Sequence, residues 1–75
     1  MDSRNLIQQN LDYLNRTKGS FHAFTVDVKL CIVSDMLREW ARCGLPHLEA
    51  FRDDWYRRNV GTSIYSLTGK YPVKN

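Results

Sequence analysis

The sequence predicts an all-α fold, a small three-helix bundle with a long central helix and a short packed C-terminal tail. Apolar residues recur at helical spacing in three separate segments. Those segments are divided by Gly19, Gly44 and Gly61, and glycine is the residue that most readily closes a helix. The chain has 75 residues, 43% hydrophobic and 25% charged, so we expect one globular domain spanning 1–75.

The first helix is predicted over about 3–18. Ile7, Leu11 and Leu14 fall at positions i, i+4 and i+7, which places them on one face of a helix. Arg16 lies near the predicted C-terminal end, where a cation interacts favourably with the helix dipole.

The central segment fits two patterns. Apolar and polar residues alternate over 24–32, which is typical of a strand. Helical spacing accounts for more of the segment and continues for four turns, through Val26, Leu30, Val33, Leu37, Trp40 and Ala41. We therefore favour a helix over about 25–43, with a strand over 24–32 and a shorter helix as the alternative.

The apolar part of this central helix covers more than half of its circumference, which is wider than a helix at the surface needs. The helix should therefore be central and covered on two sides. Two other short elements can cover only part of this apolar surface, so we expect a homodimer or a larger host protein to cover the rest of it.

The third helix is predicted over about 46–59, because proline is favoured at the first position of a helix. Its predicted core stripe consists of Leu48, Phe51 and Trp55. The tail, 60–75, is expected to pack on the bundle as a short helix or an extended strand.

Residues 51–59, FRDDWYRRN, stand out because they combine three arginines with adjacent aromatic residues. Asp53 precedes Arg57 by four positions and Asp54 precedes Arg58 by four, a spacing that stabilises a helix by about 0.2–0.5 kcal/mol per ion pair. We interpret the stretch as an amphipathic helix that stabilises itself.

Two residues of this stretch, Arg52 and Tyr56, flank the core stripe and are not explained by it. Arginine and tyrosine are common anchors of protein interfaces. The sequence therefore predicts a partner-binding surface made of Arg52 and Tyr56, with Arg38 and Arg42 of the central helix beside them.

The charge pattern is a weak signal for nucleic acid. The net charge is +3, but residues 31–59 contain five cations and five anions, and nucleic-acid binding calls for a clustered basic surface. A helix-turn-helix over 37–55 would also place Asp53 and Asp54 on its second helix, where they repel phosphate.

Chemistry-bearing residues are few, and we predict neither enzymatic activity nor a cofactor. No spacing supports a nucleophile with its base, and no glycine-rich phosphate loop is present. A zinc site is not favoured, because Cys31 and Cys43 would lie about 18 Å apart at ~1.5 Å per residue along one helix. Both cysteines are expected to be reduced packing residues.

These features together predict a non-catalytic protein-binding protein. We expect a cytoplasmic accessory or inhibitor protein, of the kind that phages and other mobile elements encode, which masks a site on a larger host protein. No membrane partner is expected, because no window approaches the ~20 apolar residues of a membrane span. The alternative is a small dimeric helical DNA-binding transcriptional regulator.

Overall fold

The computed structural model describes residues 3–60 and 71 and confirms the all-α fold class. Three α-helices occur in these residues, α1 over Ser3–Thr17, α2 over Val26–Arg42 and α3 over Leu48–Asn59. A short 3-10 helix, η1 over Gly19–Ala23, connects α1 to α2. Within the same residues, no helix combines the length and the apolar character that crossing a bilayer requires.

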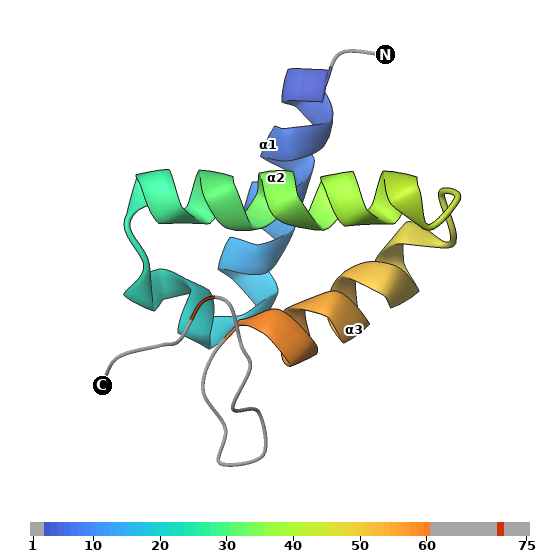
Figure 1. The fold of residues 1–75 in the computed structure, drawn as a ribbon. Coiled ribbons are helices and arrows are strands. Elements are labelled where there is room, and N and C mark those ends of the chain that lie inside the picture. Colours follow the sequence, from blue (N-terminus) through green and yellow to red (C-terminus); the bar gives the residue numbers. More distant parts are fainter. Residues whose placement is uncertain (1–2, 61–70, 72–75) are drawn as a thin grey trace.

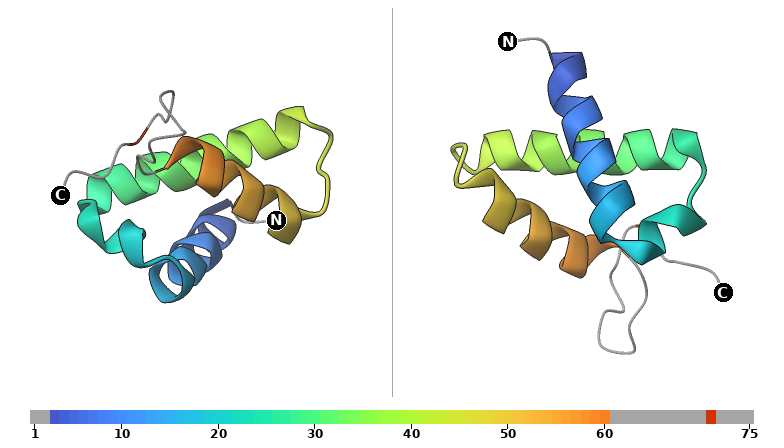
Figure 2. Two further views of the ribbon diagram at one scale, coloured as in Figure 1. Left: turned by 90° about the horizontal axis from the view of Figure 1, so that it is seen from below. Right: turned by 180° about the vertical axis from the view of Figure 1, so that it is seen from behind.

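The central helix α2 crosses α1, and α3 runs back beneath α2 from the turn at its C-terminal end (Figure 1). Seen from below, α2 lies along one side of the molecule, and α1 and α3 both lie on its other side (Figure 2, left). Among the described residues, therefore, no helix lies against the remaining side of α2.

The helical interpretation of the central segment is confirmed, and the alternative strand over 24–32 is wrong. Thr25 caps α2, because its hydroxyl accepts a hydrogen bond from the backbone N–H of Val28 at 3.3 Å. Asp27 lies in the first turn, where its negative charge complements the helix dipole.

The turn between α2 and α3 requires two left-handed residues, Gly44 with φ 87° and Leu45 with φ 57°. The carbonyl of Pro46 then accepts a hydrogen bond of 2.6 Å from Nε1 of Trp40. Because this turn uses Pro46 and His47, α3 begins at Leu48, two residues later than the proline predicts.

The core is formed by buried side chains from all four elements and from the residue that follows α3. They are Leu14, Phe21, Ile32, Val33, Met36, Trp55, Tyr56 and Val60. Three residues of the predicted central stripe are exposed and do not belong to the core, namely Val26 at 71%, Leu30 at 40%, and Ala41. The reason is the crossing arrangement, because a helix that crosses α2 covers less of its length than one that runs alongside it (Figure 1).

Val60 and Tyr71 are the described residues of the predicted tail, and both pack on the helices. The backbone N–H of Tyr71 donates to the carbonyl of Asn59 at 2.9 Å, beside a bridge between Tyr71 and Val60. Its ring lies 6.5 Å from that of Trp55, and its hydroxyl donates to Asp35. The predicted conformation of 61–70 and 72–75 lies outside the described residues.

Candidate functional site

The four residues predicted to bind a partner lie in two different environments. Arg52 and Tyr56 are buried, with exposed fractions of 7% and 6%, and make their polar contacts with α1 and η1. Arg38 and Arg42 are exposed on α2. The four side chains therefore do not form one exposed patch, and we reassign Arg52 and Tyr56 to the internal contact between α3 and the N-terminal elements.

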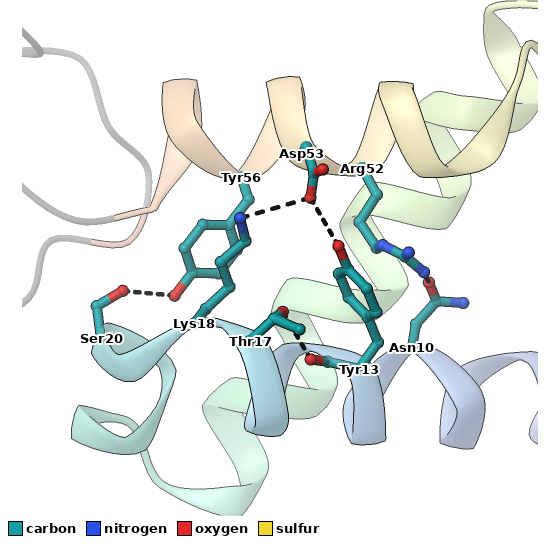
Figure 3. A network of polar contacts seen from close by, with 8 residues as sticks. All are labelled: Asn10, Tyr13, Thr17, Lys18, Ser20, Arg52, Asp53 and Tyr56. Atoms are coloured by element: carbon teal, nitrogen blue, oxygen red, sulfur yellow. Dashed lines mark hydrogen bonds and ion pairs between the residues drawn. The ribbon is translucent and has the colours of Figure 1, made fainter.

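The buried guanidinium of Arg52 is held between two residues of α1. Its Nη1 donates to Oδ1 of Asn10 at 2.8 Å, and its central carbon lies 3.4 Å from the centroid of the Tyr13 ring (Figure 3). Asn10 is itself buried and donates to the carbonyl of Leu6 at 2.8 Å. Nε of Arg52 is buried with no hydrogen-bond partner in the described part of the chain.

Further polar contacts continue this row toward η1 (Figure 3). Asp53 accepts a hydrogen bond from the Tyr13 hydroxyl at 3.3 Å and forms an ion pair with Lys18 at 3.4 Å. The hydroxyls of Tyr56 and Ser20 lie 2.7 Å apart. Burial raises the pKa of Tyr56, and its hydrogen bond with Ser20 offsets part of that rise. The contact of α3 with α1 and η1 thus depends strongly on polar groups.

One of the two ion pairs predicted within α3 is present. Asp54 pairs with Arg58 at 2.9 Å as expected, and it also pairs with Arg57 at 3.0 Å. The predicted pair of Asp53 with Arg57 is wrong, because Asp53 is directed toward Lys18 and Tyr13 instead. Both arginines at the end of α3 therefore lie beside a carboxylate, which lowers the positive potential that a nucleic acid would meet.

A hollow beside α3 has a volume of about 490 Å³ and is open to solvent. Its lining combines anionic, cationic and apolar residues, namely Lys18, Ala50, Asp53, Asp54, Tyr56, Arg57 and Val60. No single charge dominates this lining, so it does not indicate one class of small-molecule ligand.

The side of α2 that faces away from α1 and α3 is the better candidate for a functional surface. We call it the outer face of α2 and define it by its exposed residues Val26, Asp27, Leu30, Cys31, Arg38 and Arg42. Arg38 forms an ion pair of 3.5 Å with Asp35, and Arg42 has no ion-pair partner among the described residues. No described element packs over this face (Figure 2, left).

Tyr71 borders the outer face of α2 through its contact with Asp35. The carboxylate of Asp35 therefore interacts with the Tyr71 hydroxyl and with Arg38. Burial and the hydrogen bond to this carboxylate raise the pKa of Tyr71. The phenol therefore stays protonated and continues to donate to Asp35 under mildly alkaline conditions.

Cys31 and Cys43 are free thiols, as predicted, but both are exposed, so the prediction that they are packing residues is wrong. Helical spacing also places Val26 and Leu30 in the core, and the sequence predicts no role for Leu45. The signal that could have identified this surface was the excessive width of the apolar arc of α2.

No cluster of three or more His, Cys, Asp or Glu residues is placed to hold a metal ion within residues 3–60 and 71. No protein-family model, curated protein or solved structure matches the chain.

Proposed function

We propose that this protein is a non-catalytic protein-binding protein that uses the outer face of α2 to bind a larger protein. One observation carries the proposal. Among the described residues, the large hydrophobic side chains that are exposed are Val26, Leu30 and Leu45, at 71%, 40% and 60%. All three belong to α2 or to the turn that follows it.

Single exposed hydrophobic residues are normal on protein surfaces, so their location is what supports the proposal. They lie on the same helix and turn as Arg38 and Arg42. Arginine is enriched at protein interfaces, where its guanidinium binds carboxylates and its stem packs on apolar groups. Exposed apolar side chains on the same helix and turn as two exposed arginines fit a partner surface with an apolar patch and acidic groups.

The backbone of Leu45 adds independent support. A left-handed conformation costs a residue with a side chain roughly 1–2 kcal/mol compared with glycine. Leu45 adopts φ 57° and is 60% exposed, so burial of its side chain offsets little of that cost. A contact with another molecule would give this exposed leucine a role.

In the proposed mechanism, the bound protein blocks a site on its partner by steric occlusion. A helix presented on a small rigid domain can cover a functional surface without performing any chemistry. The cytoplasmic location, the inhibitor role and an origin in a phage or another mobile element are parts of this proposal. Arg38 and Arg42 remain in the proposed contact surface, while Arg52 and Tyr56 hold α3 against α1 and η1.

The test is a pull-down with tagged protein from lysate of the native host, treated with nuclease and washed at moderate salt. The variant Leu30→Glu with Arg42→Glu adds negative charge to the outer face of α2. The control, Gln9→Glu with Arg16→Glu, makes a similar change on exposed positions of α1. Circular dichroism should show that all three proteins are equally helical.

We expect wild type and control to retain one stoichiometric protein, and the outer-face variant to lose at least 90% of it. Equal capture by all three proteins would refute the assignment of the face. If nuclease or salt removes everything that is captured, the alternative of a small dimeric DNA-binding regulator is favoured, with Arg57 and Arg58 as candidate contacts.

A further inference from the structure

We propose that the outer face of α2 also binds a second copy of this chain, with the two α2 helices antiparallel. The observation behind this inference is the order of charges along the face. Asp27 lies in the first turn of α2, and Arg42 is the last residue of the helix. Both side chains are exposed, and neither has an ion-pair partner among the described residues.

The face has helical spacing along its whole length. Positions 27, 31, 34, 38 and 42 succeed one another at intervals of three or four residues, so they lie on one side of the helix. Asp27 and Arg42 are separated by 15 positions, or about 22 Å at a rise of ~1.5 Å per residue. The two charges therefore lie at opposite ends of one face.

This arrangement is self-complementary when a second copy is turned end to end. A two-fold axis between Ser34 and Asp35 places Asp27 of each copy beside Arg42 of the other, so that the ion pair forms twice. In the antiparallel orientation the two helix dipoles also point in opposite directions, which is electrostatically favourable. A parallel pair would place aspartate beside aspartate and arginine beside arginine.

The side chains between the charges fit a close approach of two helices. Cys31 and Ser34 are small and lie near the proposed axis, and packed helices require separations of about 8–10 Å. The exposed Leu30 of one copy would pack against the aliphatic stem of Arg38 of the second copy. The dimer would thus cover part of the apolar surface that α1 and α3 leave exposed.

The dimer is expected to be weak. Stable interfaces generally bury more than about 1,000 Å² in total, and one face of a single helix offers less than most of them. Interfaces of this size are characteristic of weak and transient complexes, so we expect the dimer to form mainly at the higher protein concentrations.

The inference rests on the proposed function only in that both use the outer face of α2. A second copy and the larger partner would compete for this face, so dimer formation would limit partner binding at high concentration. The dimer is tested with purified protein alone. A monomer would overturn this inference and leave the pull-down result unaffected.

The experiment is sedimentation equilibrium from 10 μM to 1 mM in reducing buffer at low salt. We expect Asp27→Arg and Arg42→Asp each to weaken the homodimer at least tenfold, because each places like charges side by side. The double variant D27R/R42D should restore the dimer. An equimolar mixture of the two single variants should form a heterodimer, since both of its charge pairs are then opposite.

The matched controls are Asp12→Arg and Arg16→Asp, which reverse charges on exposed positions of α1 and should leave the dissociation constant unchanged. Circular dichroism should confirm that each variant folds. A wild-type protein that is monomeric at 1 mM would overturn the dimer. A dimer that tolerates the single reversals, or single variants that do not associate with each other, would overturn the antiparallel arrangement.

Discussion

The guanidinium carbon of Arg52 in α3 lies 3.4 Å from the centroid of the Tyr13 ring in α1. The contact joins two helices through a buried cation and an aromatic face, an interaction that is worth about 2 kcal/mol or more when desolvated. The residue with the clearest interface chemistry in the sequence is therefore part of the internal packing. The folded state should depend on it.

We predict that Arg52→Ala lowers the free energy of unfolding by about 1–3 kcal/mol. The substitution removes the stacking on Tyr13 and leaves Oδ1 of Asn10 buried without its donor. Urea denaturation followed by circular dichroism measures the change. Arg57→Ala, on an exposed position of the same helix, should alter stability by no more than about 0.5 kcal/mol.

Equal stability of Arg52→Ala and wild type would contradict this prediction. It would mean that the desolvation of the guanidinium cancels the contacts that it makes, as replacements of buried ion pairs by apolar residues sometimes show.

Tyr71 should make the protein less stable at alkaline pH. Its pKa is raised in the folded state by burial and by the bond to Asp35, whereas a tyrosine in the unfolded chain titrates near 10. Above that pH the unfolded state loses the proton first. The stability contributed by Tyr71 is therefore complete below pH 10 and is lost as the pH rises through 10 toward the folded-state pKa.

The expected slope is up to about 1.4 kcal/mol per pH unit for one such group. Urea denaturation at pH 8, 10 and 11 measures it, and Tyr71→Phe should make the decline shallower. Some decline should remain in this variant, because the pKa of Tyr56 is raised as well. An identical pH dependence in wild type and Tyr71→Phe would show that the hydroxyl of Tyr71 has the same pKa in the folded and the unfolded state.

Leu45→Asn should stabilise the isolated protein and weaken its binding to a partner. Asparagine tolerates the left-handed conformation better than leucine, so we expect a gain of about 0.5–1 kcal/mol. The same change removes an exposed apolar side chain from the turn that follows α2, which we expect to contact the partner. Urea denaturation and the pull-down measure the two effects separately, and a gain in stability with unchanged capture would show that Leu45 takes no part in the contact.

Gly44→Ala is the matched control for the backbone of this turn. A Cβ at position 44 would meet no atom within 4 Å, so only the positive φ of 87° opposes the substitution. We expect a loss of about 1 kcal/mol. Partner binding per folded molecule should be unchanged, because this substitution adds one methyl group and leaves the outer face of α2 intact.

Local signals along the chain are sufficient to predict the segments that form α1, α2 and α3. The apolar spacing of Ile7, Leu11 and Leu14 predicts α1, and Thr25 is a residue that caps helices. The pair of Asp54 with Arg58 also depends only on positions within one helix. The observed helix bounds differ from the predicted bounds by one or two residues, because the geometry of the turns decides where each helix begins and ends.

Which side of each helix is covered depends on how the helices pack against one another. Spacing shows that Val26 and Leu30 share an apolar arc with Val33, but not that α1 crosses α2 and leaves both of them exposed. The partners of Arg52 and Asp53 are about 40 positions away in the sequence, on α1. Such contacts arise from the packing of whole helices, which the pattern of residues within a single helix does not specify.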